Sequence, residues 1–156
     1  MATGRPIRVY ADASVYGGVF DEEFEVASKA FFDAVGNGFF RLVVSTVVRD
    51  ELKEAPECVV ALFRELEQRA EVVDVSDETV ELQRAYLAAG IVGAQWRTDA
   101  LHVALATESQ CAAIVSWNFR HIVNFKKIPL YNGVNLAHGY GPIAIHTPQE
   151  VIADDR

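Results

Sequence analysis

Four polar side chains stand at the ends of apolar runs, at positions where they can meet. Asp12 ends the first β-prone run, Glu51 lies early in a helix after the second, and Asp99 opens the helix before the fourth. Asn118 ends that fourth run and adds an amide oxygen. Because the carboxyl ends of parallel strands open on one edge of a sheet, we expect these side chains to share a crevice.

Carboxylate and amide oxygens are the ligands that hard cations such as Mg²⁺ or Mn²⁺ prefer. A cation held there lowers the pKa of bound water, polarises a phosphate and offsets charge on a leaving oxygen. The residue types and their spacing therefore favour metal-dependent hydrolysis of a phosphodiester.

Each acid also has a purely structural explanation. Asp12 is placed to cap a helix or stabilise a turn, and Glu51 is placed as a solvent-exposed helical charge. Asp99 lies in a first helical turn, where the helix dipole favours a negative charge. No single acid indicates a metal site. The metal site is favoured because all three acids occur, in order, at the ends of successive elements.

The elements that carry these residues alternate between strands and helices, which predicts an α/β fold with a parallel sheet. We expect a turn at 12–14, and Ser45 or Thr46, Ser76 and Thr98 as helix caps. The predicted strands are 7–11, 41–45, 71–75, 112–118 and 142–148, and the predicted helices begin near 21, 46, 57, 76, 98 and 148.

Composition indicates one soluble α/β domain over residues 1–156. The net charge of −8 disfavours non-specific nucleic-acid binding but is compatible with a carboxylate-lined metal site. No apolar run is long enough to span a membrane, and residues 1–6 lack the apolar core of a leader. Cys58 and Cys111 show no metal-ligand spacing, so we expect two buried thiols in a reducing cytoplasm.

Four segments of the chain, in order, resemble the acidic motifs of the PIN-domain family. The resemblance spans nearly the whole chain, and the segment 117–124 resembles the family's VapC-type toxins. The four segments are Val9–Val15, Val44–Leu52, Thr98–Ala104 and Ile114–Asn118.

The resemblance implies a three-layer α/β/α sandwich with a mainly parallel sheet, and an Mg²⁺- or Mn²⁺-dependent endoribonuclease. It also implies a cytoplasmic toxin that is inhibited by a small antitoxin protein and forms a homodimer. Asp12, Glu51 and Asp99 match the family's three core acids, which bind metal and act in catalysis. Asn118 matches a fourth acid in many members. Ser116, which we expect to contact the substrate, matches the small hydroxyl residue two positions before it.

An amide at position 118 adds no negative charge, so it is compatible with two roles. Asn118 either ligates or orients a water in a working nuclease, or marks a PIN-like module that binds a partner's Arg or Lys. A phosphotransferase reaction on Asp12, as in haloacid-dehalogenase-like phosphatases, is disfavoured because that class needs a second Asp where this chain has Ser14.

Other polar and aromatic residues have two interpretations each. Ser14 contacts a phosphate or hydrogen-bonds Asp12 in a turn, and His102 supports a ligand or is simply buried. A set of basic residues contacts RNA or belongs to a solvated loop: Arg120, His121, Lys126 and Lys127. The tryptophans Trp96 and Trp117 stack on bases or pack in the core.

Overall fold

The computed structural model describes residues 5–152. Residues 1–4 and 153–156, with the expectations for the leader and the domain ends, lie outside the described residues. The described part contains a five-stranded, wholly parallel sheet in the order β3-β2-β1-β4-β5. Its strands are β1 (Ile7–Ala11), β2 (Phe40–Ser45), β3 (Glu71–Val73), β4 (Ala113–Val115) and β5 (Ala144–His146).

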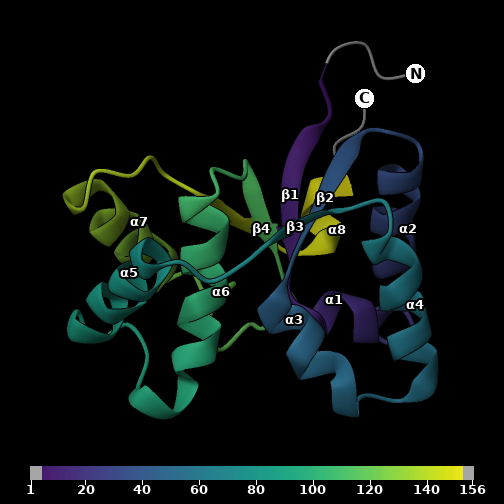
Figure 1. Ribbon diagram of the computed structural model, residues 1–156, viewed down its shortest axis with the longest axis horizontal. Helices are drawn as coiled ribbons and strands as arrows, with labels where there is room; N and C mark the ends of the chain where they lie inside the picture. The colour runs from purple at the N-terminus through teal and green to yellow at the C-terminus, as the bar shows by residue number, and fades with distance from the viewer. Residues whose placement is uncertain (1–4, 153–156) are drawn as a thin grey trace.

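Helices cover both faces of the sheet, which gives the predicted three layers (Figure 1). On one side lie α1 (Ala13–Gly18), α2 (Glu25–Gly36) and α4 (Glu57–Glu67), with α8 (Pro148–Ile152) against α2. On the other side lie α5 (Asp77–Ala88), α6 (Arg97–Glu108) and α7 (Ile128–Ala137). The shorter elements are α3 (Thr46–Glu51) and the 3₁₀ turns η1 (Leu52–Glu54) and η2 (Ala94–Trp96).

The central strands are buried because helices pack on both of their faces. Every residue of β4 is buried, as its continuous apolar sequence predicts. In β1 and β2 burial increases along the strand, so the carboxyl ends lie deepest in the core. Polar groups placed at these ends are thereby removed from bulk water, and they need partners within the protein.

Two predicted helix caps are confirmed. The hydroxyl of Ser45 accepts the backbone N–H of Val48 at 3.1 Å and begins α3 directly after β2. Ser76 begins α5 in a capping box with Thr79. The first cap fixes the direction in which α3 leaves the sheet, and therefore the place of Glu51 at its end.

The predictions for residues 12–24 were partly wrong. A short helix follows β1 in place of the expected turn at 12–14. Asp12 caps this helix, as one of its two structural interpretations predicted, because its carboxylate accepts the N–H of Ser14. The next helix begins at Glu25 rather than near residue 21, since Asp21 instead stabilises a turn by accepting the N–H of Glu23.

Three further expectations needed correction. Thr98 lies inside α6, which begins at Arg97 after the turn η2, so it is not the cap. The segment 119–140, for which no helix was predicted, contains α7. Cys111 is buried as expected, but Cys58 is exposed because it lies off the apolar stripe of α4.

Helices long and apolar enough to cross a membrane are absent from residues 5–152.

Candidate acidic site

Asp12 is the most deeply buried acid of the site, with 5% of its surface exposed. It directly follows β1, beside the end of β4, and its N–H bonds the carbonyl of Val115. Its Oδ1 accepts the hydroxyl of Ser14 at 2.5 Å, and its Oδ2 accepts the hydroxyl of Ser116 at 2.6 Å. Two hydroxyl donors from two elements therefore fix the orientation of this carboxylate.

Burial raises the pKa of Asp12, because it disfavours the charged form of a carboxyl group. The charge of His102 and the hydroxyls of Ser116 and Ser14 oppose that effect, while the negative charge of Glu51 adds to it. The net upward shift means that the surroundings leave the carboxylate's charge only partly compensated. A cation beside Asp12 would favour its ionised form.

Glu51, at the end of α3, reaches back to the sheet. Its Oε1 lies 2.6 Å from Nε2 of His102, which is 2% exposed and comes from α6. Nδ1 of His102 lies 2.7 Å from the Tyr10 hydroxyl, which is itself 2.8 Å from Oγ of Ser45. A buried chain of hydrogen bonds thus connects Glu51 to β1 and β2.

The three predicted core acids all affect the pKa of the His102 imidazole. Burial lowers the pKa of this imidazole, but the hydrogen bond and charge of Glu51 and the charges of Asp12 and Asp99 outweigh it. The net result is a raised pKa. Glu51 therefore contacts His102 directly, and the charges of Asp12, which follows β1, and Asp99, which lies in α6, also act on this imidazole.

Asp99 lies half-buried in the first turn of α6, as the sequence predicts. Its charge acts on His102 and also on the pKa values of His121 and Tyr131.

The donor chemistry of these residues fits a hard cation, but the ligands are not preassembled. Within residues 5–152, no group of three or more His, Cys, Asp or Glu side chains is arranged to hold a metal ion. Glu51 is turned to His102, to which its Oε1 is hydrogen-bonded. The buried carboxylate of Asp12, which two hydroxyls hold in place, is the feature that is compatible with a cation here.

The loop after β4 is tied to Asp12 through the two serines. Oγ of Ser14 accepts the N–H of Trp117 at 2.8 Å, and Oγ of Ser116 accepts the N–H of Asn118 at 2.9 Å. The side-chain oxygen of Asn118 instead accepts the N–H of His121 at 2.9 Å, so it stabilises the next turn. Asn118 is beside the site, and its catalytic role stays a prediction.

The tryptophans predicted to pack or to stack on bases differ in their surroundings. Trp117 stacks on Phe24 with ring centroids 4.3 Å apart and donates from Nε1 to Ser28, so it is a packing residue. Trp96 is 37% exposed and lies under the guanidinium of Arg120.

Sequence reasoning missed Tyr10 and Ser45 as neighbours of the acids, and it left His102 with two interpretations. Their positions carry a signal: Tyr10 is a hydroxyl residue between the apolar residues Val9 and Ala11, and Ser45 ends the next strand. A buried strand residue that carries a hydroxyl needs a partner, and here the partner is the imidazole.

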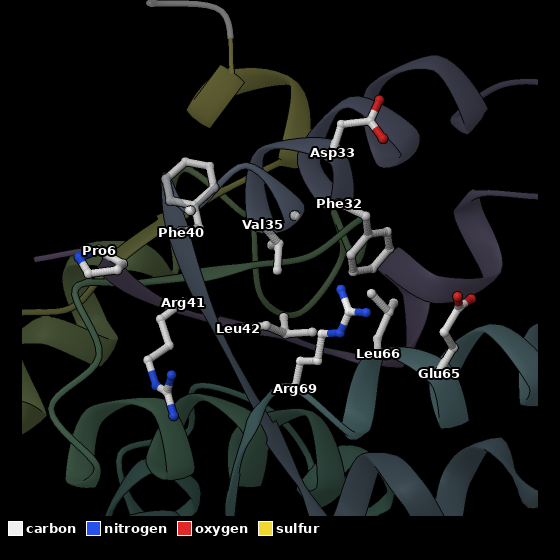
Figure 2. Close-up of a pocket in the computed structure, with 12 residues that line it drawn as sticks. Pro6, Phe32, Asp33, Val35, Phe40, Arg41, Leu42, Glu65, Leu66 and Arg69 are labelled. Atoms are coloured by element: carbon white, nitrogen blue, oxygen red, sulfur yellow. The ribbon is translucent and has the colours of Figure 1, made fainter. Parts of the chain in front are cut away.

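A cavity of about 400 Å³ lies away from the acids, near the amino ends of β1 and β2. Figure 2 shows Arg69 beside Leu42 and Leu66 there, with Asp33 and Glu65 on the same side of the view. None of the three predicted core acids lines it. It is therefore separate from the candidate site.

Comparisons with known proteins bear on the fold. No family model and no curated protein matches the chain. Among solved structures, the chain is similar to Mycobacterium tuberculosis VapC20, which is described as a toxin that cleaves the sarcin-ricin loop. The TM-score is 0.52 at 12% identity, over 86% of this chain and 98% of that chain. This likeness supports the shared α/β fold.

Proposed function

We propose that this chain is a metal-dependent endoribonuclease, with Asp12, Glu51 and Asp99 as its core acids. The observation that carries the proposal is a contact between distant elements: Glu51, at the end of α3, hydrogen-bonds the buried imidazole of His102 from α6, the helix that carries Asp99. The other nitrogen of that imidazole lies 2.7 Å from the hydroxyl of Tyr10, two residues before Asp12.

The proposed core acids are held in position by different partners. Asp12 is oriented by Ser14 and Ser116, so it presents a fixed carboxylate. Glu51 is held by His102. Mg²⁺ or Mn²⁺ bound by these acids would activate water and offset charge on the phosphate.

The biological role that we propose is that of a toxin in a toxin–antitoxin pair. The fold shared with VapC20 and the resemblance of the motifs to VapC-type toxins support it. The cytoplasm, an RNA substrate, an antitoxin protein that covers the acids and a homodimer follow as parts of the same proposal. Arg120 is the candidate contact to the RNA.

The test is cleavage of a panel of structured RNAs by the purified protein with Mg²⁺, Mn²⁺ or EDTA. We expect metal-dependent cleavage that Asp99→Asn abolishes, because the variant removes a charge without changing side-chain volume. Asp77→Asn is the matched control, since Asp77 occupies the first turn of α5 as Asp99 does that of α6. Cleavage retained in folded Asp99→Asn would reject the site.

A binding module is the second candidate, and the pairing of Glu51 with His102 favours it. A carboxylate that already hydrogen-bonds an internal imidazole can accept a partner's Arg or Lys instead. Absence of cleavage with either metal, by folded protein free of an antitoxin, would support this second function.

A further inference from the structure

An exposed aromatic ring and an arginine lie together next to Asp99. Trp96, in η2, stacks on His121 with ring centroids 4.7 Å apart and an interplanar angle of 27°. The guanidinium carbon of Arg120 lies 5.3 Å from the centre of the Trp96 ring, within range for a cation–π contact. We call Trp96, Arg120 and His121 the Trp96 platform.

His121 has hydrogen-bonding capacity that the described fold does not use. It is 6% exposed, and neither of its ring nitrogens has a partner among residues 5–152. Burying such groups without partners is unfavourable, and native structures rarely leave them so. The unpaired imidazole therefore points to a ligand group that completes its hydrogen bonds.

The pKa of His121 is affected by charges of both signs. Burial lowers the pKa of His121, the charge of Asp99 raises it, and the charges of Lys127 and Arg120 lower it further. Two cations and one of the proposed core acids therefore act on a single ring. The platform adjoins Asp99 along the chain, because η2 ends at Trp96 and α6, whose first turn holds Asp99, begins at Arg97.

The surrounding sequence has a charge distribution that suits an anion. None of the chain's 22 acidic residues lies between residues 109 and 149, whereas Arg120, Lys126 and Lys127 all do. In a chain of net charge −8, this segment carries only basic charge. It attracts a polyanion beside a site whose own acids repel one.

The same loop also exposes aromatic side chains. Phe119 is 51% exposed and Phe125 is 93% exposed, so neither is a core residue. Proteins that bind single-stranded nucleic acid combine aromatic faces, on which bases stack, with basic groups that follow the backbone. Paired bases in a duplex keep their faces stacked, so this surface favours an unpaired strand.

We propose that the Trp96 platform binds an unpaired nucleotide of the RNA substrate, next to the bond cleaved at the acids. The base stacks on Trp96, the phosphate contacts Arg120, and His121 donates or accepts the hydrogen bond that no described residue takes. This inference rests on the proposed ribonuclease function and adds the strand state of its substrate.

The test is binding of a short, labelled single-stranded RNA to the intact protein in EDTA, followed by fluorescence anisotropy. Trp96→Leu should weaken binding about tenfold, a typical loss for one stacked base. Phe39→Leu is the matched control, because Phe39 is 54% exposed at the opposite, amino end of β2. A duplex of the same sequence should bind more weakly than the single strand.

A second variant keeps the test independent of the folding of η2. Arg120→Gln should reduce the dependence of log affinity on log salt by about 0.7, the expected value for one phosphate contact to a single strand. Arg64→Gln, on the exposed surface of α4, should leave that dependence unchanged. Equal salt dependence in both variants would overturn the phosphate contact.

The outcomes separate this proposal from the ribonuclease itself. Unchanged binding by Trp96→Leu, or equal binding of strand and duplex, rejects the platform even when the wild-type protein cleaves RNA with Mg²⁺. If Trp96→Leu weakens RNA binding but the wild-type protein cleaves no RNA, the platform is supported and the ribonuclease function is rejected. Absence of strand binding by the wild-type protein rejects the platform and leaves a protein partner for this surface.

Discussion

Tyr10 offers the sharpest test of the buried hydrogen-bond chain behind the acids. Its hydroxyl lies 2.7 Å from Nδ1 of His102 and 2.8 Å from Oγ of Ser45, and the side chain is fully buried. Tyr10→Phe removes only the hydroxyl and leaves the ring in place, so no large cavity forms. The change isolates the hydrogen bonds from the packing.

The expected cost follows from the groups that lose a partner. Two buried hydrogen bonds disappear, each worth about 1 kcal/mol, and Nδ1 of His102 is left unpaired at a further cost. The hydroxyl of Ser45 still accepts the hydrogen bond from the N–H of Val48. We expect the free energy of unfolding to fall by about 2–3 kcal/mol, which lowers the melting temperature by roughly 5–10 °C for a chain of this size.

Tyr16→Phe is the matched control with the opposite expectation. Tyr16 is also fully buried, but its hydroxyl has no hydrogen-bond partner among residues 5–152. Removing an unpaired buried hydroxyl leaves stability unchanged or raises it by about 1 kcal/mol. Urea unfolding of the two variants measures both effects, and equal stabilities for Tyr10→Phe and Tyr16→Phe would refute the reasoning.

Three further predictions concern pH, packing and the amide. The raised pKa of His102 means that its stabilising contribution is complete below about pH 6.5, the unfolded value, and is lost as pH rises through the folded pKa. Urea titrations should therefore show the stability gap between wild type and His102→Gln shrinking above that pH, and a constant gap would contradict this. Gly18→Ala places a methyl group 2.8 Å from Nε1 of Trp117 and should cost about 1–3 kcal/mol in thermal unfolding. Gly17→Ala, with nothing within 4 Å, should instead stabilise α1 by about 0.5–1 kcal/mol, and the reverse order would rule out this packing. Asn118→Asp keeps the oxygen that accepts the N–H of the next turn, so RNA cleavage should stay equal or rise, and complete loss would assign the amide a specific role.

The architecture was largely predictable because a buried element requires a characteristic pattern of apolar residues in the sequence. Strand β4 is a continuous apolar run, and only a strand covered on both faces tolerates such a composition. Ser45 at the start of α3 follows an equally local rule, since a hydroxyl there satisfies a free N–H group. The predictions that failed depended on finer local choices, such as a helix after Asp12 that includes Gly17 and Gly18.

The internal partners of the site were harder to predict because they depend on contacts between distant elements. Glu51 and His102 are 51 positions apart, and their contact requires α3 and α6 to approach the same strand ends. Sequence placed Asn118 correctly after β4 but could not show that its oxygen turns to the N–H of His121. That choice depends on the conformation of a loop, which no periodic pattern encodes.

The most direct test of the central claim is a Mn²⁺ titration of the intact protein, followed by electron paramagnetic resonance. If Asp12, Glu51 and Asp99 form one metal site, the wild-type protein binds Mn²⁺ clearly more tightly than Glu51→Gln does. Glu54→Gln, an exposed acid in the adjoining turn η1, should bind as the wild type does. Equal Mn²⁺ affinity of the wild-type protein and Glu51→Gln would contradict the account.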